Sequence, residues 1–143
     1  MFSWQAASAE EFEALHQLRL AAMCPSLQAI GLYDPARSRA RFAGRFHPGV
    51  TRWIVWQERR IGFSAMRHEA DACYLDHLYI LPTAQGLGAG SWALRAQQLA
   101  AAAQAKAIVL CALRDSPANH FYRRHGFVPT GEDEWDIWYR WQR

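Results

Sequence analysis

A short glycine-rich segment in the middle of the chain constrains most strongly what this sequence can fold into. The apolar run 78–81 leads through Pro82 into a turn with glycine at alternate positions, and an alanine-rich stretch follows directly. An apolar run of this kind is typical of a strand, and the alanines, leucines and glutamines after the turn favour a long helix. The sequence therefore predicts a strand at 73–80, a turn containing Gly86, Gly88 and Gly90, and a helix to about residue 105.

This turn is suited to hold a phosphate group. The first backbone N–H groups of a helix have no acceptor inside it and carry partial positive charge. Glycines let the backbone curl around an anion and keep side chains out of its path. No Gly-Lys pair is present, which excludes a P-loop, and Ser91 stands where a dinucleotide fingerprint needs its last glycine. The turn is a candidate diphosphate cradle, with a turn that binds no ligand as the alternative.

The elements around the turn predict one mixed α/β domain over residues 1–143. Ser8 and Glu11 form a capping box for a first helix, which Pro25 is expected to end or kink. No linker or repeat divides the chain. Strands are expected at 2–5, 53–57, 61–67, 73–80, 107–113, 127–130 and 135–141, and further helices at about 35–46, 86–105 and 116–126.

Two segments, the turn at 82–90 and the segment 118–127, resemble signatures of the GNAT N-acetyltransferase superfamily. The segment 118–127, ANHFYRRHGF, is similar to the family's A-x-x-F-Y-x-x-x-G-F pattern. The acyl-CoA-binding motif is matched by Pro82, Gln85, Gly86, Gly88 and Gly90. The resemblance implies a mixed, mostly antiparallel central sheet of six to seven strands, with two central strands splayed and about four flanking helices.

The resemblance also implies acetyl-CoA as the cosubstrate and names the residues that bind it. Leu78 and Ile80 would hold the pantetheine through their backbone, and an N–H of that strand would polarise the thioester carbonyl. The family's asparagine before the second motif is replaced by Asp115-Ser116 here, so Ser116 is expected to take its contact. The pyrophosphate would be held by the backbone of Gln85, Gly86, Leu87, Gly88, Ala89 and Gly90.

Catalysis would rest on Tyr122, which matches the family tyrosine that protonates the departing CoA sulfur. A tyrosine packed in the core is the alternative reading. Because an ammonium group has no lone pair, the acceptor amine must lose a proton before it attacks. Asp76 is the expected base, and His77, whose usual pKa lies nearer neutrality, or a water molecule are the alternatives.

The acceptor site in the family lies on the first two helices and the last strands, which here contain many aromatic and acidic residues. The aromatic side chains could surround a cation, belong to the hydrophobic core, or form a homodimer interface. Asp34, Glu134 and Asp136 could pair with an amine. The aromatic residues are Tyr33, Trp135, Trp138, Tyr139 and Trp141.

Composition narrows the function classes further. The net charge of +3 admits an anionic cofactor but falls far short of a nucleic-acid-binding pattern. No apolar run is long enough for a membrane span, the N-terminus lacks a signal-peptide pattern, and neither the three cysteines nor the six histidines have metal-ligand spacing. We expect a metal-free cytoplasmic acetyltransferase for a primary amine of a small molecule or peptide. A catalytically weak CoA-binding or protein-interaction module is the alternative.

Overall fold

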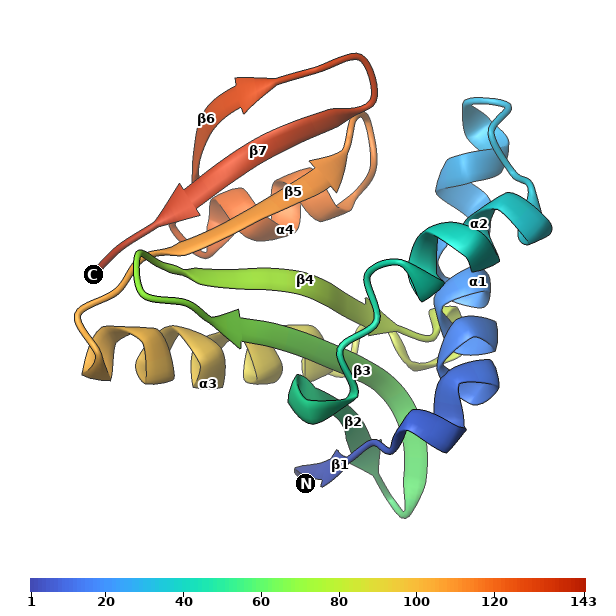
Figure 1. The fold of residues 1–143 in the computed structure, drawn as a ribbon, viewed down its shortest axis with the longest axis horizontal. Helices are drawn as coiled ribbons and strands as arrows, with labels where there is room; N and C mark the ends of the chain where they lie inside the picture. Colours follow the sequence, from blue (N-terminus) through green and yellow to red (C-terminus); the bar gives the residue numbers. More distant parts are fainter. The chain divides into compact units, whose positions relative to one another are not determined.

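The computed structural model describes residues 1–143, and its strands form one seven-stranded sheet (Figure 1). The strand order is β1-β2-β3-β4-β5-β7-β6. This confirms the predicted mixed α/β fold. The strands are β1 (Phe2–Ala6), β2 (Thr51–Trp56), β3 (Arg59–His68), β4 (Cys73–Ile80), β5 (Ile108–Leu113), β6 (Val128–Glu132) and β7 (Asp136–Trp141), and the helices are α1 (Phe12–Ala29), α2 (Pro35–Ala43), α3 (Ala89–Ala103) and α4 (Ala118–Arg124).

Contacts between residues divide the chain into two compact units. Unit 1 comprises Met1–Ala65 and His77–Ala93, and unit 2 comprises Met66–Asp76 and Leu94–Arg143. β3, β4 and α3 each contribute residues to both units. The single domain over residues 1–143 remains a prediction.

Unit 1 is built on an antiparallel ladder of β1, β2 and the first part of β3. Gln57 and Glu58, between β2 and β3, have φ of 50° and 62°, as a two-residue type I′ hairpin turn requires. Because side chains alternate along a strand, β2 and β3 contribute side chains to two separate apolar clusters. One cluster includes Leu15, Phe42, Trp53 and Phe63, and the other includes Ile54, Ile61, Ala89 and Ala93.

Unit 2 is organised around β5. All six residues of β5 pair antiparallel with β7, and β7 pairs antiparallel with β6. β5 pairs with β4 in parallel at only two positions, Cys73 with Ile108 and Tyr74 with Val109. The ladder between β4 and β5 therefore ends early although both strands continue, as the predicted splay of two central strands requires.

Two helix boundaries differ from the sequence-based expectation. α1 continues through Pro25 to Ala29, so of the two effects expected of Pro25, an end or a kink, the end does not occur. The proline lacks only the N–H that would bond Ala21, one hydrogen bond in an 18-residue helix. α3 begins at Ala89, because Gly86 and Gly88 have φ of +87° and cannot be part of a right-handed helix.

The buried His16 of unit 1 makes the stability of the protein sensitive to acid. Its ring centre lies 6.1 Å from that of Phe12 and 6.4 Å from that of Phe42, and the residue is 3% exposed. Burial lowers the pKa of His16 below its usual value, and this outweighs the opposing charge of Glu13. At acid pH the unfolded chain binds a proton at His16, whereas the native state keeps this ring neutral. The free energy of unfolding is therefore highest above the unfolded pKa of about 6.5 and decreases as the pH falls below it.

We expect the free energy of unfolding, measured by urea denaturation, to fall between pH 7.5 and 5.5. His16→Gln removes the titrating group and should reduce this fall. His120→Gln, at an exposed position of α4, should leave the fall unchanged. Equal pH dependence in the wild type and His16→Gln would show that another group controls acid stability.

Candidate functional site

The candidate cofactor site starts at the glycine turn of unit 1. Residues 85–88 are exposed, and a Cβ built at Gly86 or Gly88 would meet no atom within 4 Å. Trp92 donates its backbone N–H to the Gly88 carbonyl at 2.9 Å and opens the hydrogen bonding of α3. The N–H groups of Ala89 and Gly90 precede it and are unpaired donors of the helix start. An accessible turn with unpaired N–H groups fits a phosphate ligand.

The side chain of Gln85 closes this turn. Its Nε2 donates to the Ile80 carbonyl at 3.2 Å, which ties the turn to the end of β4. The sequence motif marked Gln85 as a cofactor residue but did not show this structural contact. The backbone N–H of Gln85 donates to the Pro82 carbonyl at 3.4 Å, so it would have to leave this bond to serve a ligand.

The unit 1 part of β4 presents two different faces, as strand alternation predicts. Leu78 and Ile80 pack against the apolar cluster that includes Ala89 and Ala93 of α3. Tyr79 packs on the other cluster, with residues of α1 and α2. Leu78 and Ile80 thus share one face of the strand, and the neighbouring residues point to α1 and α2.

His77, the alternative base, is buried in a chain of hydrogen bonds and is only 2% exposed. Its Nε2 lies 3.1 Å from the Arg45 carbonyl, and its Nδ1 lies 3.3 Å from the Tyr79 hydroxyl. A carbonyl can only accept, so Nε2 carries the hydrogen of the neutral ring and Nδ1 accepts from Tyr79. The Tyr79 oxygen in turn accepts from Nε of Arg19 at 3.2 Å. Both ring nitrogens of His77 are therefore engaged within unit 1.

Asp76, the expected base, lies in unit 2 in a bidentate ion pair with Arg67. Nε of Arg67 is 2.6 Å from Oδ2 of Asp76, and Nη2 is 3.3 Å from Oδ1. The Asp76 side chain is 10% exposed. Hydrogen bonding to Asp76 raises the pKa of Arg67 above its usual value. Sequence reasoning missed Arg67, because nothing in the spacing of residues 67 and 76 indicates that β3 and β4 bring them together.

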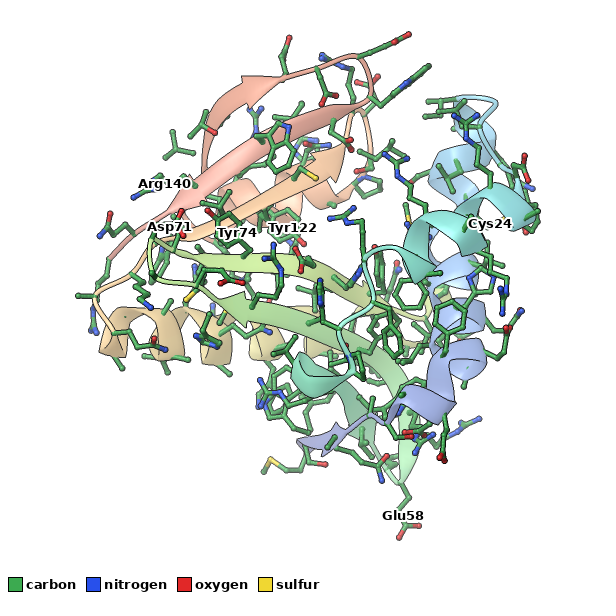
Figure 2. All side chains as sticks on the ribbon, in the orientation of Figure 1. Cys24, Glu58, Asp71, Tyr74, Tyr122 and Arg140 are labelled. Atoms are coloured by element: carbon green, nitrogen blue, oxygen red, sulfur yellow. The ribbon has the colours of Figure 1, made fainter.

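Tyr122 lies on α4 in unit 2 and is labelled in Figure 2. It is 7% exposed, and its ring centre is 5.6 Å from that of Phe127 and 6.3 Å from that of Tyr139. The Tyr122 carbonyl accepts the N–H of Phe127 at 3.1 Å. Packing of this kind holds the phenol ring in one place, which a positioned acid requires.

Asn119 links the end of β5 to α4 and β7. Its Nδ2 donates to the carbonyls of Leu113 (2.9 Å) and Ser116 (3.0 Å), and its Oδ1 accepts from the Tyr139 hydroxyl at 2.7 Å. The Ser116 hydroxyl lies 3.4 Å from the same Nδ2. The amide of Asn119 is thus occupied by structural contacts, and the cofactor contact expected of Ser116 remains a prediction.

The aromatic residues expected near an acceptor divide into core and surface. Tyr139 is fully buried and cannot line an open pocket, whereas Trp135 and Trp138 are about 40% exposed. Tyr33 is 37% exposed in unit 1. Asp34 caps α2, because its side chain accepts the backbone N–H of Arg37 at 3.1 Å.

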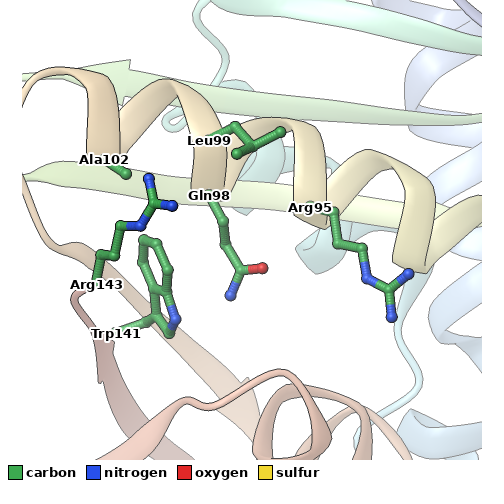
Figure 3. Close-up of a pocket in the computed structure, with 6 residues that line it drawn as sticks. All are labelled: Arg95, Gln98, Leu99, Ala102, Trp141 and Arg143. Carbon is green, nitrogen blue, oxygen red and sulfur yellow. The ribbon is translucent and has the colours of Figure 1, made fainter.

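A pocket of about 270 Å³ lies in unit 2 (Figure 3). Residues of the C-terminal part of α3 form one side, and Trp141 and Arg143 form the other. No residue expected at the cofactor or catalytic site lines it. The lining residues are Arg95, Gln98, Leu99, Ala102, Trp141 and Arg143.

No group of three His, Cys, Asp or Glu side chains is placed to hold a metal ion, and no helix is both long and apolar enough to cross a membrane.

Comparison with known families decides the identity of the fold. Residues 48–129 match the family model of the acetyltransferase (GNAT) domain, more than half of the chain. The chain belongs to the GNAT acetyltransferase family. This confirms the resemblance inferred from the two motifs, and membership in this family supports acyltransferase activity.

Solved structures confirm the GNAT fold over the whole chain. PaiA N-acetyltransferase from Thermoplasma acidophilum in complex with coenzyme A has a TM-score of 0.81 at 15% identity and covers 100% of this chain and 99% of its own. The ribosomal-protein-S18-alanine N-acetyltransferase from Escherichia coli has a TM-score of 0.73 at 14% identity, with 99% and 94% covered. At these identities the likeness shows the fold alone. A search of the curated proteins finds no match.

Proposed function

We propose that this GNAT protein is an acetyl-CoA-dependent N-acetyltransferase. The observation that carries the proposal is the accessible glycine turn between β4 and α3, with the unpaired N–H groups of Ala89 and Gly90 at the start of α3. A neighbour of the same fold was solved with coenzyme A, which supports the same ligand here. The acetyl thioester would supply an activated acyl group, and the protein would supply binding and proton transfer.

The cofactor would be held mainly by backbone groups. The N–H groups of residues 85–90 would bind the pyrophosphate, whose charge matches the positive end of α3. The backbone of Leu78 and Ile80 would bind the pantetheine, and an N–H of this strand would stabilise the negative charge that develops on the thioester oxygen. Ser116 is proposed to add a polar contact in place of the missing asparagine.

Tyr122 would act as the general acid. When the amine nitrogen bonds to the acetyl carbon, the bond between that carbon and sulfur breaks and leaves a thiolate. The phenol of Tyr122 would give its proton to this sulfur, and the proton lost by the amine would pass to a base. The ring packing of Tyr122 on Phe127 and Tyr139 supports this role, because it fixes the direction of the hydroxyl.

Asp76 is the proposed base, with His77 or a water molecule as alternatives. The ion pair with Arg67 orients the Asp76 carboxylate but also competes with an incoming proton. His77 has Nδ1 engaged by Tyr79, so it would need this bond to break before it could accept a proton. The acceptor would be a primary amine of a small molecule or a peptide, and the exposed Trp135 and Trp138 would face either the acceptor or a second copy of the chain.

A catalytically weak CoA-binding module is the second candidate. The Asp115-Ser116 replacement favours it, since a polar contact near the pantetheine is altered. Release of CoA thiol in the presence of an amine panel separates the two, because a binding module would bind acetyl-CoA without releasing thiol.

Gly88→Ala tests the cofactor site directly. An alanine at φ of +87° costs about 1–2 kcal/mol of stability, and its methyl group and altered backbone would disturb the N–H groups of the turn. We expect affinity for acetyl-CoA, measured by calorimetry, to fall at least about tenfold.

Gly31→Ala is the matched control for this experiment. Gly31 also has positive φ (73°) and open surroundings, but it lies outside the turn. It should lose similar stability and keep the affinity for acetyl-CoA. Wild-type protein without affinity for acetyl-CoA at millimolar concentration would refute the proposed function.

A further inference from the structure

Arg19 of α1 is a buried cation in unit 1. The residue is 4% exposed, and its neighbour on α2, Ser38, is 9% exposed. Nε of Arg19 donates to the Tyr79 hydroxyl at 3.2 Å, and Nη1 donates to the Ser38 hydroxyl at 2.6 Å. The guanidinium also lies 5.6 Å from the ring centre of Phe42. These contacts solvate the charge with neutral groups and do not neutralise it.

The acidic residues of unit 1 are engaged elsewhere or exposed. Glu11 forms an ion pair with Arg60, and Glu13 forms one with Arg39. Asp34 caps α2, and the remaining two, Glu10 and Glu58, are exposed. A buried charge without a counter-ion is costly, so proteins usually pair such charges. The environment of Arg19 is therefore one that an anion would stabilise.

The groups around Arg19 form a cluster of unused hydrogen-bond donors. An arginine has five N–H donors, and the two bonds above use two of them. Ser38 accepts from Arg19, which leaves its own hydroxyl hydrogen to donate. The Tyr79 hydrogen is already directed to Nδ1 of His77. The cluster thus offers N–H and O–H donors and needs an acceptor.

The charge of unit 1 as a whole favours an anion as well. It contains eight basic and five acidic residues, so it carries the entire net charge of +3. Arg37 and Arg41 on α2 are exposed and add to this positive field. A single uncompensated guanidinium balances one negative charge, which matches a carboxylate better than a phosphate monoester near −2.

We propose that Arg19 and Ser38 bind the carboxylate of the acceptor, so that the acceptor is an amine that also carries a carboxylate, as an amino acid does. The proposal rests on the proposed N-acetyltransferase function, since only an acceptor amine makes the carboxylate part of a substrate. The guanidinium would bind the two carboxylate oxygens, and the Ser38 hydroxyl would donate to one of them.

Matched ligand pairs test the proposal. 1,5-Diaminopentane is lysine without its carboxylate, and propylamine has a methyl group where β-alanine has its carboxylate. Calorimetry measures the binding of each to the protein with and without bound CoA. We expect the carboxylate member of at least one pair to bind about tenfold tighter or more. Equal binding within both pairs, no binding of any member, or tighter binding of O-phosphoethanolamine than of β-alanine would overturn the proposal.

Variants separate carboxylate binding from a structural role of Arg19. Arg19→Met should abolish the preference for the carboxylate member, and Ser38→Ala, which keeps the guanidinium, should reduce it. Arg41→Met, at an exposed position of α2, removes part of the positive field but leaves the Arg19 guanidinium in place, so it should keep most of the preference. A folded Arg19→Met or Ser38→Ala protein with unchanged preference would contradict the assignment. CoA affinity is read separately, so loss of CoA binding would refute the proposed function and not the carboxylate site.

Discussion

Tyr122→Phe is expected to bind acetyl-CoA as the wild type does and to lose about 10²-fold or more in kcat, the usual contribution of a positioned general acid. The substitution removes the hydroxyl and keeps the ring that packs on Phe127 and Tyr139. Calorimetry with acetyl-CoA measures the binding, and thiol release with an amine acceptor measures the turnover. Unchanged turnover in a folded Tyr122→Phe protein would remove Tyr122 from the catalytic machinery.

Tyr139→Phe is the matched control, because it removes a buried hydroxyl from the same packed group of rings. Loss of the Tyr139 hydroxyl should lower the free energy of unfolding, because its hydrogen bond to Asn119 is removed, and should leave kcat within a few-fold of the wild type.

Asp76→Asn, measured in the same assay, keeps the size of the side chain and removes its basicity. It should lower kcat/KM, and an unchanged kcat/KM in the folded Asp76→Asn protein would rule out Asp76 as the base.

Gly62→Ala should lower both the stability of the protein and its affinity for acetyl-CoA, because Gly62 lies against β4. Gly62 lies on β3, and a Cβ there would overlap the carbonyl oxygen of Tyr79 and lie 2.7 Å from Cδ1 of Ile80. A backbone carbonyl in a ladder has little room to move. We expect a loss of about 3 kcal/mol in the free energy of unfolding, measured by urea denaturation. Acetyl-CoA affinity should fall as well, since Ile80 belongs to the proposed pantetheine strand.

Gly49→Ala provides the control for added size alone. A Cβ at Gly49 would meet no atom within 4 Å, and its φ is not positive, so the free energy of unfolding should change by less than about 1 kcal/mol. If Gly62→Ala were as stable as Gly49→Ala, β3 and β4 would have to separate more easily than this close approach implies.

Local patterns in the sequence predicted the fold class well and the element boundaries less well. Alternation along 73–80 correctly separates Leu78 and Ile80 from Tyr79, because side-chain direction in a strand depends only on position. Pro25 shows the limit of such reasoning, since a helix of 18 residues tolerates the loss of one hydrogen bond that a local rule treats as a stop.

The candidate site was predictable to the extent that it is local. The glycine turn and Tyr122 each lie within a contiguous motif, so their residue types and spacing were visible in the chain. Gly62 carries no such signal. Only its distance to Tyr79 and Ile80 shows why a side chain is excluded there.

By itself the sequence determined the strand, the glycine turn and the helix that opens from it, because neighbouring residues set backbone conformation and leave the first helical N–H groups unpaired. Tertiary structure alone decided which polar groups meet. It joined Arg19 to Tyr79 across 60 positions of the chain and gave Asp76 its partner Arg67. Hydrogen bonds and ion pairs depend on distances of about 3 Å between atoms, and residues remote in sequence reach such distances only when the chain folds.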